Sequence, residues 1–230
     1  MLQYLQQLYD NNTPEFIYYK TLFHIFEKFL HDTGKTDAEL GQTSLFETEI
    51  WKALFEFQKD GVKGAINKVL RHNGCIVADS VGLGKTYEAL AVIKYFELKD
   101  ERVLVLCPNK LRENWTVYKA NSRLNPFLAD RFRYDVLAHT DLSRERGYSS
   151  DINLETLNWG NYDLVVIDES HNFRNNTPGK RDEAGNLIRK SRYQRLMDEI
   201  IKAGVRTKVL LLPATPVNNE GPAQPALFPD

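Results

Sequence analysis

The stretch Cys75-Ile-Val-Ala-Asp-Ser-Val-Gly-Leu-Gly-Lys-Thr86 decides how the rest of the chain is interpreted. A short apolar run ends in a glycine-spaced turn, and Lys85 then opens a helical pattern that continues to Leu98. A strand, a tight loop and a helix in this order direct backbone N–H groups and a helix N-terminus into one concavity, which favours anions. The pattern therefore predicts a phosphate-binding loop.

The residue types in this loop suit a nucleotide. Gly82 and Gly84 let the backbone approach a phosphate without a Cβ in the way. Lys85 can reach terminal phosphates, and the Thr86 hydroxyl can ligate Mg²⁺. One position departs from the general pattern, because Asp79 stands where a glycine is usual. The residues expected around the nucleotide in this segment are Val81, Gly82, Leu83, Gly84, Lys85 and Thr86.

Composition and charge place the chain among ordinary globular proteins. It has 230 residues, 42% of them hydrophobic and 27% charged, with a net charge of −1. Its apolar runs are too short to span a membrane, and no secretory signal is visible. Cys75 and Cys107 both lie in apolar runs, which favours two buried thiols in a reducing compartment. We expect a cytoplasmic protein.

Charge is unevenly distributed along the chain. Residues 1–60 hold 5 Lys/Arg and 10 Asp/Glu, whereas residues 171–208 hold 10 Lys/Arg and 4 Asp/Glu. The segment Thr177–Arg192 is especially basic and suits either a DNA or partner contact or a solvated loop.

The order of elements indicates an α/β fold with a mainly parallel sheet, because strands apolar on both faces alternate with helices. Expected helices lie at 1–9, 14–31, 47–71, 87–98, 111–120 and 193–203. Expected strands lie at 75–78, 103–107, 134–138, 164–167 and 209–212, with 143–161 uninformative. We predict a helical extension and linker at 1–46 and the main lobe at 47–230.

A second motif, Leu164-Val-Val-Ile-Asp-Glu-Ser-His171, places two carboxylates at the end of a buried strand. Ligands of open parallel sheets bind outside that edge. Asp168 would hold Mg²⁺, and Glu169 would orient or deprotonate the attacking water. The predicted catalytic residues are thus Lys85, Asp168 and Glu169.

Five segments together resemble the motifs of the Swi/Snf-type branch of superfamily-two helicase-fold ATPases. The segment Asp79–Thr86 resembles motif I, and its Asp79 is typical of that branch. Phe57-Gln58 resembles the Q motif, and Asp168-Glu-Ser-His171 resembles the DExH box. The segment Leu104–Pro108 with Asn114-Trp115 resembles motif Ia, and the segment Ala214-Thr-Pro216 resembles motif III. Ser80-Val81 and Ser170-His171 are most similar to bacterial members.

The resemblance implies a RecA-like lobe of a DNA-dependent ATPase and translocase that uses ATP and Mg²⁺. Gln58 would read the adenine edge. Residues implied in nucleic-acid contact or coupling are Pro108, Lys110, Asn114, His171, Arg174 and Thr215. Duplex DNA is the expected track, and no membrane partner is expected.

Alternatives remain open on function. An RNA or single-strand helicase, or the motor subunit of a restriction system, would share these motifs. A nucleotide-gated interaction module without motor activity is a further alternative. The resemblance also implies a second RecA-like lobe, which we expect beyond this chain, so that the 230 residues form a fragment with weak hydrolysis on its own.

Overall fold

The structure is a computed structural model that describes residues 40–41, 43–78, 84–173, 179–181, 187–203 and 206–213. The helices expected at 1–9 and 14–31 lie outside the described residues.

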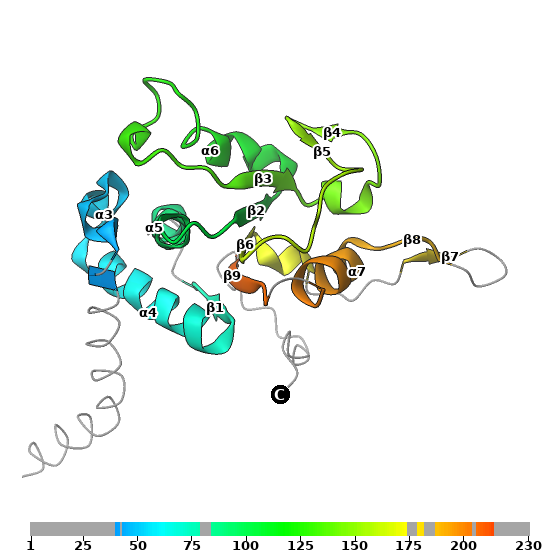
Figure 1. Cartoon of the computed structure of the whole chain (residues 1–230), viewed down its shortest axis with the longest axis horizontal. Coiled ribbons are helices and arrows are strands. Elements are labelled where there is room, and N and C mark those ends of the chain that lie inside the picture. The colour runs from blue at the N-terminus through cyan, green and yellow to red at the C-terminus, as the bar shows by residue number, and fades with distance from the viewer. Residues whose placement is uncertain are drawn as a thin grey trace, which may run out of the picture.

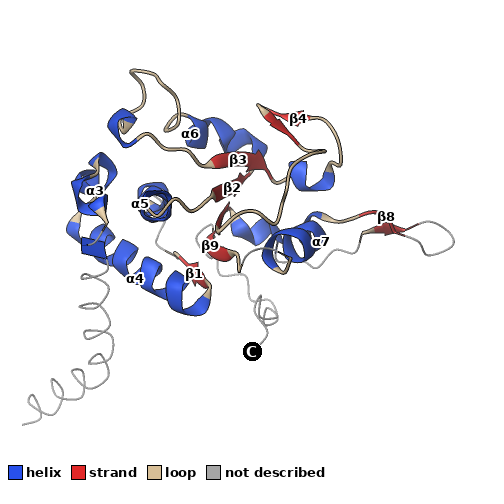
Figure 2. Ribbon diagram, in the orientation of Figure 1, coloured by secondary structure: helices blue, strands red, loops and turns tan. Residues whose placement is uncertain are grey.

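A parallel sheet forms the centre of the described chain (Figures 1 and 2). Its five strands are hydrogen-bonded in the order β1-β9-β6-β2-β3, and every neighbouring pair is parallel. The strands are β1 (Gly74–Ile76), β2 (Val103–Cys107), β3 (Asp135–Ala138), β6 (Leu164–Asp168) and β9 (Lys208–Leu212). The predicted α/β class with a parallel sheet flanked by helices is confirmed.

Helices and short hairpins surround the sheet. The α-helices are α3 (Glu49–Ala53), α4 (Glu56–His72), α5 (Lys85–Leu98), α6 (Arg112–Thr116) and α7 (Arg192–Arg195), which continues as the π-helix η6 (Leu196–Ile201). The 3₁₀ turns are η1 (Ser44–Glu47), η2 (Asn109–Leu111), η3 (Leu128–Asp130), η4 (Asp141–Ser143) and η5 (Ser170–Phe173). Two antiparallel hairpins are formed by β4 (Tyr148–Ser149) with β5 (Ile152–Asn153), and by β7 (Lys180–Arg181) with β8 (Leu187–Arg189).

The central strands are buried on both faces, which explains their unbroken apolar sequences. In β2, Val103 and Val105 join one hydrophobic cluster, while Leu104 and Leu106 join the other. The first cluster lies under α3, α4 and α5, and the second includes Leu196 and Ile200 of the α7–η6 segment. Full burial of each such side chain stabilises the fold by about 1.5–3 kcal/mol. Apolar contacts on both faces therefore hold the central strands in place.

The helix expected over 47–71 is two helices with an extended break. Leu54 and Phe55 have ψ angles of 141° and 159°, outside the helical region. Thr48 caps α3 by accepting the Trp51 N–H at 3.3 Å, and the Gln58 side chain accepts the Phe55 N–H at 3.0 Å to begin α4. The continuous apolar pattern hid this break, because both helices bury residues in the same cluster.

Other boundaries differ modestly from expectation. The helix predicted at 111–120 shortens to α6 and is followed by turns, and the one predicted at 193–203 widens into a π-helix at Leu196. Strands β2, β3, β6 and β9 lie within one residue of their predicted positions, whereas β1 ends at Ile76 and not at Ala78.

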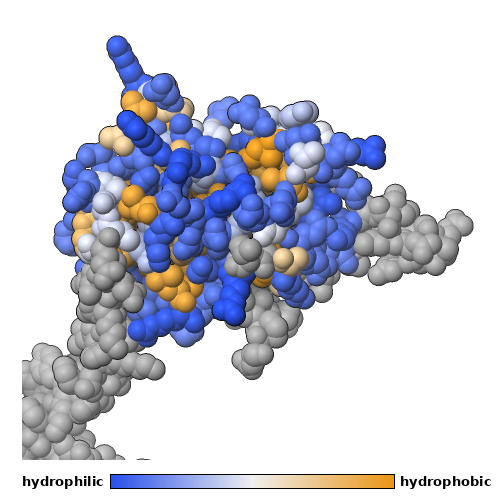
Figure 3. All heavy atoms as spheres, viewed as in Figure 1, coloured by the Kyte–Doolittle hydropathy of each residue, from blue (hydrophilic) through white to orange (hydrophobic). Residues whose placement is uncertain are grey.

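The visible surface is mostly hydrophilic with scattered apolar patches (Figure 3). Among the described residues, no helix is both long and apolar enough to cross a membrane.

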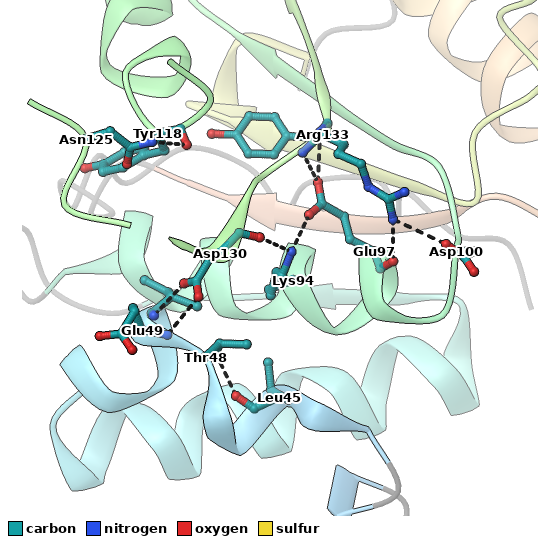
Figure 4. Close-up of polar contacts among 12 residues, drawn as sticks. Leu45, Thr48, Glu49, Lys94, Glu97, Asp100, Tyr118, Asn125, Asp130 and Arg133 are labelled. Atoms are coloured by element: carbon teal, nitrogen blue, oxygen red, sulfur yellow. Dashed lines mark hydrogen bonds and ion pairs between the residues drawn. The ribbon is translucent and has the colours of Figure 1, made fainter. Parts of the chain in front are cut away.

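A buried polar cluster ties α5 to η3 and α3 (Figure 4). The Asp130 carboxylate accepts the Glu49 and Ile50 N–H groups at 2.8 and 2.7 Å. Lys94 donates to the Asp130 carbonyl and pairs with Glu97 at 3.2 Å. This cluster fixes the N-terminal helices on the lobe from the side of α5.

Candidate active site

The candidate site lies at the carboxyl edge of the sheet, where parallel strands deliver their following residues to one place. Three of these segments carry the predicted chemistry: the loop after β1 that leads into α5, the end of β6 at Asp168, and Pro213 directly after β9. The register aligns Asp168 with Leu212 on the neighbouring strand, so Pro213 lies beside the acidic pair.

Lys85 begins α5 and reaches across this edge. Its Nζ donates a hydrogen bond to the Pro213 carbonyl oxygen at 2.8 Å. Its positive charge lowers the pKa of Asp168, although burial outweighs that effect. The phosphate-loop lysine, the acidic strand end and the segment after β9 are therefore brought together, as their parallel order predicts.

Gln58 lies close to Gly84, directly before α5. Its carboxamide is buried, with an exposed fraction of only 3% for the residue. Gly84 has a φ of +87°, and a Cβ added there would lie 2.5 Å from Gln58 Nε2. The positive φ favours glycine at position 84, and a side chain there would also displace the end of the Gln58 side chain. This contact joins the start of α4 to the start of α5.

Asp168 ends β6 and is held by two donors. The indole Nε1 of Trp115 donates to Oδ2 at 3.0 Å, and the Glu169 backbone N–H donates to Oδ1 at 2.9 Å. Burial raises the pKa of the Asp168 carboxyl, with the adjacent Glu169 charge adding to the rise, while Trp115 and Lys85 oppose it. A partly buried carboxylate that its neighbours do not fully compensate favours a bound cation.

Glu169 follows Asp168 in an uncommon backbone conformation. Its φ of +50° lies in the left-handed region, which a non-glycine residue adopts rarely. The turn is held by Asn172, whose Nδ2 donates to the Glu169 carbonyl at 2.9 Å. The Glu169 Oε2 lies 3.2 Å from His171 Nδ1. The two acids are therefore held differently despite being adjacent: Asp168 is held by Trp115 and by the Glu169 N–H, and the Glu169 carboxylate lies beside His171.

The remaining predicted residues fall at the same edge or outside the described chain. Thr86 is the second residue of α5 and is partly buried. Pro108 follows β2 directly, and Lys110 and Asn114 are exposed on η2 and α6. The predicted residues that lie outside the described chain are Val81, Gly82, Leu83, Arg174 and Thr215.

Two residues of the site were not predicted from the sequence. Trp115 stood within the motif Ia segment without an assigned role, yet its indole binds Asp168. His139 follows β3, is 4% exposed, and packs edge-on against Phe173 with ring centroids 4.7 Å apart. Burial lowers the pKa of His139 to about 4, despite bonds to the backbone of Leu106 and Asp168 that raise it. Neither contact has a local sequence signal, because each joins segments that are distant in the chain.

The basic segment Thr177–Arg192 includes the β7–β8 hairpin. Two of its cations have partners within the lobe: Lys190 pairs with Glu199 at 2.6 Å, and Arg192 Nε donates to Ser143 Oγ at 3.3 Å. A DNA or partner contact by this segment stays a prediction.

Comparison with known protein families identifies the chain. The model of the SNF2-related domain matches residues 2–228, nearly the whole sequence. The chain belongs to the SNF2-related domain family. The resemblance inferred from the five motifs is thereby confirmed. This SNF2-related domain is of the helicase-like ATPase type, found in proteins that act on DNA. The match includes residues 2–46, and the predicted boundary at 46/47 stays a prediction.

Individual relatives agree with this assignment. The chain is 28% identical over 169 residues to the DNA annealing helicase and endonuclease ZRANB3 of Mus musculus, covering 68% of this chain and 15% of that protein. It is 29% identical over 159 residues to the uncharacterised ATP-dependent helicase YqhH of Bacillus subtilis (strain 168), covering 66% of this chain and 25% of the relative. The SNF2-related domain described here therefore spans a quarter or less of the length of these relatives.

Among solved structures, the SWI2/SNF2 ATPase core of Sulfolobus solfataricus in complex with dsDNA is similar to 72% of this chain and 32% of that chain. The sequence identity is 20% and the TM-score is 0.43.

Proposed function

We propose that this chain is the first, ATP-binding lobe of a DNA-dependent ATPase and translocase, which hydrolyses ATP to ADP and phosphate when joined to a second lobe. The observation that carries the proposal is the hydrogen bond from Lys85 Nζ to the Pro213 carbonyl at 2.8 Å, which brings the lysine at the start of α5 to the sheet edge where Asp168 pairs with Leu212. A lysine, a carboxylate and a helix N-terminus at one point match the needs of a metal-bound triphosphate.

Each residue would have a distinct role in the proposed reaction. Lys85 would neutralise charge on the terminal phosphates, and Gln58, against Gly84, would select adenine. Glu169 would orient the attacking water and take its proton. In-line attack would be promoted mainly by positioning and by charge neutralisation.

The residues present fit a magnesium ion. The hydroxyl of Thr86 and the carboxylate of Asp168 are the hard oxygen ligands that Mg²⁺ prefers. The raised pKa of Asp168 reflects a carboxylate whose charge the protein alone compensates incompletely. When held by Thr86 and Asp168, the ion would supply positive charge that neutralises the charge developing during transfer.

Duplex DNA is the proposed track. One relative supports it by name, as a DNA annealing helicase and endonuclease. Lys110 and Asn114 are exposed and follow β2, which pairs with β6. They are candidates for sequence-independent contacts with the phosphate backbone of DNA.

The test is the ATPase rate of the full-length protein in the presence of duplex DNA, single strands and RNA. We expect the largest stimulation by duplex DNA, falling steeply with salt. Preference for single strands or RNA would reassign the track. No stimulation by any nucleic acid would contradict the translocase function and would favour a nucleotide-gated interaction module.

Two further measurements test the chemistry. Glu169→Gln in the full-length protein should bind ATP normally and lose turnover, and a wild-type rate would place the base elsewhere. The 230-residue chain alone should bind ATP but hydrolyse it slowly, because an arginine supplied across a cleft is worth about 10³–10⁵ in rate in related phosphoryl-transfer enzymes.

A further inference from the structure

Trp115 joins helix α6 to the acidic end of β6. Its indole Nε1 donates to Asp168 Oδ2 at 3.0 Å, and the residue is only 1% exposed. A tryptophan has one side-chain donor and no acceptor. The bond to Asp168 therefore satisfies the full hydrogen-bonding capacity of this buried indole.

The indole is fixed from behind by Tyr134. The Tyr134 hydroxyl donates to the Trp115 carbonyl at 2.7 Å, and the two rings pack edge-on with centroids 6.3 Å apart. Tyr134 is itself buried, with an exposed fraction of 1%. Both the backbone and the ring of Trp115 are thus held, so the N–H has a defined direction.

Helix α6 is in turn anchored to the lobe by Arg112. Its Nη2 donates to the Val136 carbonyl of β3 at 3.1 Å and to Ser149 Oγ at 2.7 Å. A five-residue helix has little stability of its own. These bonds hold α6 in a fixed place, and with it the donor that reaches Asp168.

The two donors on Asp168 set the orientation of its carboxylate. Trp115 occupies one lone-pair position on Oδ2, and the Glu169 N–H occupies one on Oδ1. An ionised carboxylate has about four such positions, which leaves one on each oxygen for a ligand. Without the indole, the bond within the Asp168–Glu169 turn would be the one side-chain hydrogen bond left to orient the group among the residues that the structure describes.

We propose that Trp115 is a positioning residue: by its N–H···Oδ2 bond it holds the Asp168 carboxylate in the orientation that receives a divalent cation. This role rests on the proposed function, because it assumes that Asp168 is the magnesium ligand. Partners that orient metal-binding carboxylates typically change metal affinity 10–100-fold when removed. Trp115 differs from a purely structural core residue in that its loss acts on the metal-dependent part of nucleotide binding.

The experiment compares ATP affinity of the chain with Mg²⁺ and with EDTA, by titration calorimetry, in wild type and Trp115→Phe. We expect the ratio of the two affinities to fall about 10-fold in the variant, with the affinity in EDTA unchanged. Trp159→Phe is the matched control. Trp159 is also buried, but its ring centroid lies 5.5 Å from Cζ of Arg195, and no hydrogen bond joins its indole to Asp168 among the described residues. It should leave both affinities unchanged.

A second replacement covers the case in which Trp115→Phe fails to fold. Benzothienylalanine at position 115, introduced by nonsense suppression, keeps the bicyclic shape and lacks the N–H. It should reproduce the loss of magnesium dependence without the cavity that Trp115→Phe would leave in the core.

The outcomes separate the two proposals. A wild-type chain with no magnesium-dependent ATP binding would overturn the proposed function, and the role of Trp115 with it. Wild-type magnesium dependence that persists in folded Trp115→Phe or in the benzothienylalanine variant would overturn the role of Trp115 alone. A loss of affinity that is equal in EDTA and in Mg²⁺ would also overturn it, because it would show a general distortion of the site.

Discussion

The charged groups around α5 form two sets, one beside η3 and one at the carboxyl edge of the sheet, and they differ in how completely each charge is compensated. Beside η3, the Glu97 Oε1 accepts the Arg133 and Tyr134 N–H groups at 2.7 and 2.9 Å, and Oε2 pairs with Lys94 (Figure 4). Lys94 also donates to the Asp130 carbonyl. These buried charges satisfy one another.

At the carboxyl edge the opposite holds. Lys85 donates to a neutral carbonyl, that of Pro213, and burial raises the pKa of Asp168 in spite of its two donors. The first set fixes elements to one another, whereas the second leaves charge available for a ligand. We infer that the degree of compensation, more than burial itself, distinguishes the charges that hold this lobe together from those proposed to bind a ligand.

The largest loss of stability is expected when the charge of Glu97 is removed. Glu97→Gln keeps the shape and the acceptor for Arg133 and Tyr134 but places an amide N–H₂ against the buried Lys94 ammonium. Leaving a buried charge unpaired costs about 3–5 kcal/mol. Urea unfolding should show a loss of that size. Glu49→Gln, which breaks an exposed pair with Lys52, is the control and should change little. A Glu97→Gln variant as stable as wild type would mean that this cluster does not hold the lobe.

His139 gives the next largest effect, through pH. The folded pKa of about 4 lies below the ordinary value of 6.5, so between these values the unfolded chain binds a proton that the folded chain does not. The free energy of unfolding should therefore fall as the pH drops from 6.5 to 4, by about 3 kcal/mol.

His139→Phe should remove that part of the pH dependence, measured as urea unfolding at pH 7 and pH 4.5. His72→Gln, at the exposed end of α4, is the matched histidine control. An identical pH profile in His139→Phe and wild type would show that His139 is not held in its neutral form by burial.

The smallest effect on stability is expected at Asp168. Asp168→Asn removes a charge that burial disfavours, which stabilises the folded state. It also loses one of two acceptor oxygens, which destabilises the folded state. Each effect on the free energy of unfolding is about 1 kcal/mol. The free energy of unfolding at pH 7 should therefore change by no more than about 1 kcal/mol, while the magnesium dependence of ATP binding disappears. A loss as large as that of Glu97→Gln would erase the distinction between the two sets of charges.

The placement of Lys85 and Asp168 at one sheet edge could be predicted from the sequence, because Lys85 follows one strand and Asp168 ends another in one parallel sheet, whereas their roles in binding phosphate stay predictions. The apolar runs at 103–107 and 164–167 defined parallel strands, and parallel order alone places Lys85 near Asp168. That reasoning needs only local patterns and the direction of the strands.

What sequence could not give depends on contacts between distant segments. The bond from Trp115 to Asp168 spans 53 residues, and the cap of α3 by Asp130 spans about 80. The break at Leu54 was hidden because the apolar pattern continues through it, while capping by Thr48 and Gln58 ends one helix and begins the next. Backbone angles such as the +50° φ of Glu169 also leave no local signature.

The central claim is that the loop before α5 and the end of β6 form one Mg–ATP site. Titration calorimetry of the chain with Mg–ATP, in wild type and Lys85→Ala, tests it most directly. We expect saturable binding of Mg–ATP by wild type and no detectable binding by Lys85→Ala, with both proteins equally folded by circular dichroism. Unchanged affinity in Lys85→Ala would contradict the phosphate-loop assignment and the site built upon it.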